Sequence, residues 1–109
     1  MEYCLVYMTA GSHDEAVRIG HALVAEHLAA CVNVLGPITS IFRWDGATQE
    51  DQEVAFLAKT RAEHVDALAA RVQALHSYDC ACAVALPIQG GHPPFLQWIG
   101  EETEVTPQN

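Results

Sequence analysis

The segment HSYDCAC at residues 76–82 gathers an imidazole, a carboxylate and two thiols within seven positions. Thiolates and imidazole together are ligands that suit copper(I) or zinc. Cys80 and Cys82 are two positions apart, so in a strand both thiols would point to the same side and reach one ion. A single Cys-x-Cys is weak evidence for a closed zinc site, because such a site normally takes four ligands. The segment therefore favours a soft metal ion held by His76, Asp79, Cys80 and Cys82.

Each of these residues also has a purely structural interpretation. His76 at a helix C-terminus would be favoured by the helix dipole, and Cys82 would be a core residue of a strand. Met8, near the end of the first expected strand, adds a thioether as a further soft ligand. Its alternative is a buried strand methionine, and the sequence leaves both alternatives open.

Two long strands and their turn are expected upstream of this segment. The apolar run from Cys31 to Trp44, interrupted at Gly36-Pro37, predicts one strand, and Asp45-Gly46 predicts a turn. An acidic segment follows, and Val54–Ala58 is the second predicted strand. Such strands form an arm that projects beyond a domain of this size, and an exposed arm usually pairs with another chain. We therefore expect an obligate oligomer.

The remaining patterns complete a split βαβ arrangement. They predict a strand at 2–8, a helix capped by Ser12 and Glu15, a helix opened by Thr60 and Glu63, a strand at 82–86 stopped by Pro87, a short helix at 95–102 and a short added strand near Val105. The order β-α-β-β-α-β predicts an α+β, ferredoxin-like antiparallel sheet with both helices on one face. The other face would leave apolar side chains in water, which again favours an oligomer.

Composition limits the possible functions. With 109 residues, half of them hydrophobic, the chain is expected to be a single globular domain. The net charge of −9 opposes binding to nucleic acid and to anionic membranes. The N-terminus shows no signal-peptide pattern, so we expect a cytoplasmic protein whose four cysteines are reduced. The chain lacks a glycine-rich phosphate loop, HExxH and Gly-x-Ser-x-Gly, so we predict no enzyme activity.

Several of these segments together resemble the CutA family, which is linked by name to divalent-cation tolerance. The resemblance is carried by LAACVNV at 28–34, Gly36-Pro37, Arg43-Trp44, the Glu-rich hairpin, Lys59-Thr60, His76–Asp79, ALPI at 85–88 and FLQWIGEE at 95–102. It covers about residues 3–102 and leaves 103–109 as a C-terminal tail. It implies a trimer whose sheets pack together and whose arms pair between subunits. The architecture is also similar to that of PII-type signalling proteins, which bind ligands between subunits.

The resemblance implies a cleft between subunits lined by Lys59, Trp44, Arg43, Tyr78 and Trp98. Family members commonly carry His-Pro-Tyr-Glu, one residue, then Pro and Glu. This chain keeps His76 and Tyr78 and has Asp79 in place of the first Glu. It carries Ser77 and Ala81 where the family has Pro, and Cys82 where the family has the second Glu. A thiol in place of a carboxylate implies a stronger preference for copper(I).

Charged residues suggest a second kind of site. Lys59 ahead of a helix N-terminus predicts a small anion site, with a salt bridge across the trimer as the alternative. The acidic residues Glu50, Asp51 and Glu53 would pair with Lys59 or Arg43 of a neighbour, or form a solvated turn.

Two functions follow from these observations. The first is a cytoplasmic homotrimer that binds copper or another divalent metal ion in clefts between subunits and contributes to metal tolerance, with no obligatory cofactor. The alternative is a PII-like signalling or scaffold protein that binds a small anionic ligand in the same cleft.

Overall fold

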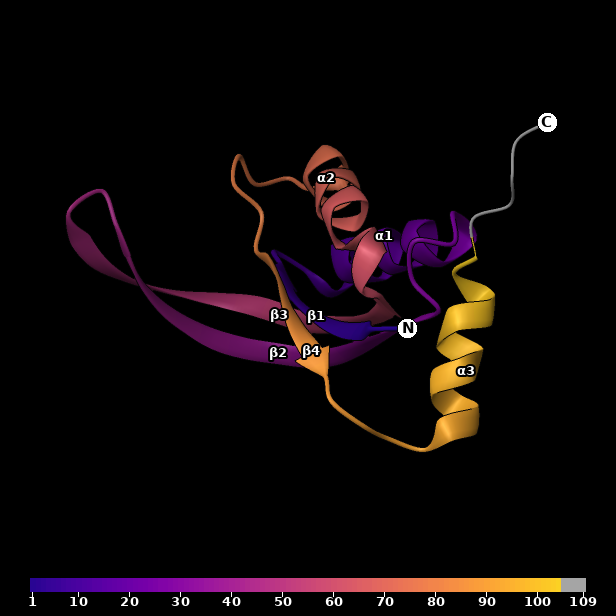
Figure 1. Ribbon diagram of the computed structural model, residues 1–109. Coiled ribbons are helices and arrows are strands. Elements are labelled where there is room, and N and C mark those ends of the chain that lie inside the picture. Colours follow the sequence, from indigo (N-terminus) through magenta and orange to yellow (C-terminus); the bar gives the residue numbers. More distant parts are fainter. Residues whose placement is uncertain (105–109) are drawn as a thin grey trace.

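The computed structural model describes residues 1–104 and shows an α+β fold built on one four-stranded antiparallel sheet (Figure 1). The elements are β1 (Tyr3–Ala10), α1 (His13–Ala25), β2 (Cys31–Trp44), β3 (Ala47–Arg61), the 3₁₀ turn η1 (Ala62–His64), α2 (Val65–Leu75), β4 (Ala83–Ile88) and α3 (Pro93–Glu102). The strand order β2-β3-β1-β4 is the ferredoxin-like order that the sequence predicts. The strand predicted near Val105 lies outside the described residues.

Helices α1 and α2 cover one face of the sheet, whereas α3 lies apart from them and packs against β1 and β3 (Figure 1). The core between the two helices and the sheet contains fully buried side chains from four elements: Val6, Met8, Ile19, Leu23, Phe56, Leu68 and Val72. Met8 is therefore a buried methionine of a strand, which is the structural alternative to a metal ligand. Among the described residues, no helix is long and apolar enough to cross a membrane.

The hairpin arm is longer than the sequence predicts. Strand β3 starts at Ala47 rather than Val54, because the acidic segment pairs with β2 along the whole arm, from Trp44↔Ala47 to Ile38↔Glu53. Asp45 and Gly46 form the turn with φ values of 53° and 78°, the two positive values that a type I′ hairpin requires. The arm extends beyond the rest of the molecule (Figure 1). The turn expected for the acidic run is therefore wrong, although residues 47–52 are exposed to solvent.

The second predicted capping box is also wrong. Lys59 and Thr60 lie inside β3, and the Thr60 hydroxyl donates to the carbonyl oxygen of Leu28 at 2.7 Å. Glu63 pairs instead with Arg61, and the 3₁₀ turn precedes α2 without a side-chain cap. The first predicted cap is confirmed, since the Glu15 amide donates to Ser12 Oγ at 3.1 Å.

Strand β4 begins after the two cysteines of the 76–82 segment. It runs from Ala83 to Ile88 rather than from 82 to 86, so neither Cys80 nor Cys82 belongs to a strand. Pro87 does not stop β4, because β4 is an edge strand and needs no hydrogen bond on its outer side.

The face of the sheet opposite α1 and α2 is apolar and open. Leu35 of β2 and Val84 and Leu86 of β4 are 60%, 56% and 54% exposed. Together with the arm, this open face is the feature from which the sequence predicts an oligomer.

Candidate functional site

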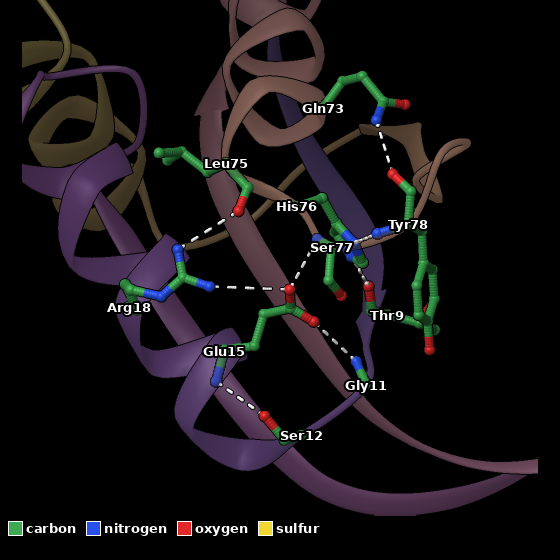
Figure 2. Close-up of polar contacts among 10 residues, drawn as sticks. All are labelled: Thr9, Gly11, Ser12, Glu15, Arg18, Gln73, Leu75, His76, Ser77 and Tyr78. Carbon is green, nitrogen blue, oxygen red and sulfur yellow. Dashed lines mark hydrogen bonds and ion pairs between the residues drawn. The ribbon is translucent and has the colours of Figure 1, made fainter.

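A network of part-buried polar contacts fixes the start of the 76–82 loop (Figure 2). We call Thr9, Gly11, Glu15, His76 and Ser77 the brace. The Glu15 carboxylate, only 7% exposed, accepts hydrogen bonds from the backbone amides of Gly11 at 3.0 Å and Ser77 at 2.8 Å. Burial would raise the pKa of Glu15, but these donors outweigh burial and hold the pKa below its usual value. The brace therefore joins the N-terminus of α1 to the loop that follows α2.

His76 uses both ring nitrogens inside the brace. The Tyr78 amide donates to Nδ1 at 3.1 Å, so the ring proton sits on Nε2, which donates to the Thr9 carbonyl oxygen at 2.7 Å. The imidazole is thus neutral in this arrangement, and its nitrogens hold the loop against β1 (Figure 2). A metal ion would have to displace one of these contacts to reach His76.

Gln73 of α2 holds the next part of the loop. Its Nε2 donates to the Tyr78 carbonyl oxygen at 3.0 Å, and its Oε1 accepts from the Ala81 amide at 2.9 Å. The two contacts lie on either side of Asp79 and Cys80, so the amide of Gln73 fixes both ends of this short bend.

A cleft of about 460 Å³ lies between the loop and the hairpin arm. It is lined by Thr9 of β1, by Phe42, Trp44, Gln49, Asp51 and Glu53 of the arm, and by Tyr78, Asp79, Cys80 and Cys82 of the loop. The lining thus combines aromatic rings, carboxylates and two thiols. No lysine or arginine from residues 1–104 belongs to it.

Negative charge dominates the electrostatics of the cleft. Burial, a 3.0 Å hydrogen bond that the Tyr78 hydroxyl donates to Glu53 and the charges of Glu53, Glu15 and Asp51 raise the pKa of Tyr78 to about 12. Burial and the charge of Glu53 also raise the pKa of the Cys82 thiol, against a hydrogen bond with Thr9. Burial disfavours charge at both groups, while the carboxylates of Asp51, Glu53 and Asp79 repel an added negative charge, so the cleft favours a cation over an anion.

The cleft contains five of the ten residues that the sequence predicts for a site: Trp44, Tyr78, Asp79, Cys80 and Cys82. His76 lies behind it in the brace, and Met8 is in the core. Within the described part of the chain, no three His, Cys, Asp or Glu side chains gather closely enough to hold a metal ion.

Comparison with known proteins gives the family. The sequence model of the CutA1 divalent ion tolerance protein matches residues 4–102. This chain belongs to the CutA1 family. It is 46% identical over 99 residues to the divalent-cation tolerance protein CutA of Thermus thermophilus, covering 91% of this chain and 96% of that one.

Other CutA proteins agree in fold. The solved structure of the periplasmic divalent cation tolerance protein CutA from Archaeoglobus fulgidus has a TM-score of 0.90 and 42% identity, covering 94% of this chain and 99% of that one. The Xenopus laevis CutA homolog is 43% identical over 95 residues, or 87% of this chain. This chain spans 63% of the Xenopus protein and 55% of the mouse and human CutA proteins.

Lys59 and Trp98, which the CutA resemblance implies for the cleft, lie elsewhere within one chain. Lys59 Nζ donates to Asn33 Oδ1 at 2.9 Å and sits 5.5 Å from the ring centroid of Phe95, which contacts Trp98 at 5.4 Å. Lys59 does not precede a helix N-terminus as expected, because β3 continues to Arg61. Arg43, also expected in the cleft, donates to the Gly46 carbonyl oxygen at the tip of the arm.

Sequence reasoning missed Phe42, Gln49 and Thr9 as lining residues. The arm residues were detectable, because side chains two positions apart in a strand share a face. Phe42 and Trp44 alternate along β2, and Gln49, Asp51 and Glu53 alternate along β3 on the same face, since Phe42 pairs with Gln49. Thr9 gave no such signal, because only the tertiary fold brings β1 to the loop.

Proposed function

We propose that this protein contributes to divalent-cation tolerance by binding metal ions in its acidic cleft, as a homotrimer in the cytoplasm. The observation that carries the proposal is the lining itself, which contains two thiols and several carboxylates and no lysine or arginine from the described residues. Membership of the CutA1 family, whose relatives are named for divalent-cation tolerance, supports the same function. The proposal includes a reducing compartment, because only free thiols serve as ligands.

The thiols of Cys80 and Cys82 are the proposed principal ligands, with Asp79 beside them. Sulfur donors favour copper(I). Burial and the charge of Glu53 raise the pKa of Cys82, and a bound cation would offset that charge. His76 would join this set by giving up a contact in the brace, and Met8 by leaving the core. Since one chain offers no cluster of three ligands among residues 1–104, water or a neighbouring subunit would complete the coordination shell.

The homotrimer is supported by the open sheet face. Leu35 of β2 and Val84 and Leu86 of β4 are exposed apolar side chains, and each Å² of apolar surface left in water costs roughly 25 cal/mol. Packing such faces together removes that cost, and the projecting arm then lies where it can reach a neighbour (Figure 1). This arrangement would place the cleft near a subunit boundary.

Native mass spectrometry under reducing conditions, before and after titration with copper(I) and with zinc, tests the proposal. We expect a trimer that takes up copper(I) and loses this uptake in a Cys80→Ser/Cys82→Ser variant. Cys31→Ser is the matched control, because Cys31 is a half-buried free thiol outside the cleft. A trimer that stays metal-free would contradict metal binding, and a monomer would contradict the proposed assembly.

The alternative proposal is a PII-like protein that binds a small anion at Lys59. It is favoured by one observation: the Lys59 ammonium lies beside the Asn33 amide and forms no ion pair within the described chain. Under this alternative, Lys59→Ala abolishes anion binding. The variant leaves copper uptake unchanged under both proposals, so anion binding is the measurement that separates them.

A further inference from the structure

Cys80 and Cys82 are two free thiols of one loop. Cys80 is exposed and Cys82 is half-buried, and both line the cleft. They lie between α2 and β4, in a segment that belongs to no helix or strand. The ladder of backbone hydrogen bonds that would resist a local change of conformation in a strand is therefore absent from both positions.

The spacing suits a bond between the two sulfurs. Residues two apart are joined by two Cα–Cα steps of about 3.8 Å each, so a bend at Ala81 would bring Cys80 and Cys82 into the range of about 4.4–6.8 Å that disulfides span. Ala81 and Cys82 follow the bend at 77–80 and belong to no helix or strand, so no regular element holds the chain straight between the two cysteines. The residue between the cysteines is Ala81, whose small side chain leaves the ring free to close.

We propose that Cys80 and Cys82 form a reversible dithiol–disulfide couple that reacts with low-molecular-weight disulfides such as glutathione disulfide. The exposed Cys80 attacks one sulfur of glutathione disulfide as the thiolate, which forms a mixed disulfide and releases one glutathione. Cys82 then attacks the Cys80 sulfur and displaces the second glutathione. Two protein thiols are oxidised to one disulfide, one glutathione disulfide is reduced to two glutathione molecules, and the two thiol protons leave with them.

The dithiol–disulfide couple would control metal binding in the cleft, a consequence that rests on the proposed function. A disulfide removes both thiolates from the lining, so the oxidised protein keeps its carboxylates and loses its soft ligands. Bound copper(I), in turn, would protect both thiols from oxidation. The site would thus bind soft metal ions only under reducing conditions.

The sequence allows a direct assay of the pair. Arg71 is the last lysine or arginine of the chain, so trypsin releases residues 72–109 as one peptide that contains Cys80 and Cys82 and no other cysteine. Reduced, metal-free protein is treated with glutathione disulfide, alkylated and digested with trypsin. The mass of the 72–109 peptide is then measured by mass spectrometry. We expect the peptide to lose both alkylation sites and to be lighter by two hydrogens than its reduced form, with full recovery after dithiothreitol. A peptide alkylated twice, or one that keeps glutathione, would overturn the proposal.

Two variants sharpen the assay. Cys82→Ser removes the second thiol, so glutathione should stay bound to Cys80, whereas Cys31→Ser should form the disulfide as the wild type does. Formation of the disulfide in Cys31→Ser, with glutathione retained on Cys80 in Cys82→Ser, supports the couple. Failure of Cys31→Ser to form the disulfide, or no glutathione on Cys80 in Cys82→Ser, overturns it. Because the assay uses metal-free protein, its failure is distinct from failure of the proposed function, which the copper titration detects.

Discussion

The brace and the cleft share one loop but differ in how many of their polar groups have partners within the chain. In the brace, the Glu15 carboxylate and both nitrogens of His76 have partners within the chain. In the cleft, Asp51 and Asp79 have no ion-pair partner among residues 1–104, and Trp44 is 62% exposed. Satisfied polar groups hold a structure, whereas groups that lack partners are available to a ligand. The brace therefore fixes the loop that the cleft uses.

The largest expected effect is on stability, from Glu15→Ala in the brace. The change leaves the amides of Gly11 and Ser77 without an acceptor in a part-buried site, so we expect a loss of about 3 kcal/mol in unfolding free energy. Urea denaturation at fixed protein concentration measures it. Glu26→Ala, which removes an exposed ion pair with Arg71, is the control and should cost less than about 1 kcal/mol. Equal losses in the two variants would contradict the brace.

Acid should weaken the brace in a defined direction. Because the folded pKa of Glu15 lies below its unfolded value near 4.5, its stabilisation is present above that pH and is lost as the pH falls through the folded pKa. We expect the stability gap between wild type and Glu15→Gln to shrink as the pH is lowered from neutral to about 3. Denaturation curves across this range measure it, and a gap that widens in acid would contradict the sign.

Tyr78 links the brace to the cleft and should give an intermediate effect. Tyr78→Phe removes the hydrogen bond to Glu53, so we expect a loss of about 1 kcal/mol. In the wild type, ultraviolet absorbance should show one tyrosine that ionises near pH 12. The raised pKa means that the neutral hydroxyl stabilises the fold until the pH rises through that value. If the absorbance change near pH 12 persists in Tyr78→Phe, another tyrosine causes it.

The smallest effect on stability is expected in the cleft. Asp79→Asn should change the unfolding free energy by less than about 0.5 kcal/mol, because Asp79 has no ion-pair partner in the described chain. It should nevertheless weaken copper(I) binding several-fold in a competition titration. Asp66→Asn, at an exposed position on α2, is the control and should leave binding unchanged. Equal binding in both variants would remove Asp79 from the site.

Local patterns predicted most of the fold, and long-range pairing accounts for the errors. Apolar runs located the strands, and Ser12 with Glu15 located the first helix. The acidic segment of the arm resembles a turn in composition, but pairing with β2 makes it a strand. Thr60 resembles a helix cap, but its hydroxyl binds Leu28, which is distant in the sequence and adjacent in the fold.

The site was partly predictable for the same reason. Asp79, Cys80 and Cys82 lie close together in sequence, so their clustering needed no knowledge of the fold. His76 belongs to the same segment, yet its nitrogens face Thr9 and Tyr78, an orientation that sequence alone does not reveal. Lys59 lies near the end of β3, whereas the β3 residues that line the cleft lie in the arm at 49–53. This separation follows from the register of the strands, which the sequence alone does not reveal.

The most direct test of the proposed metal site is a crystal of the reduced, copper(I)-loaded protein, with diffraction measured on both sides of the copper absorption edge. We predict an anomalous peak in the cleft, within bonding distance of the sulfurs of Cys80 and Cys82. A peak at another position, or none at the two sulfurs under full copper loading, would contradict it.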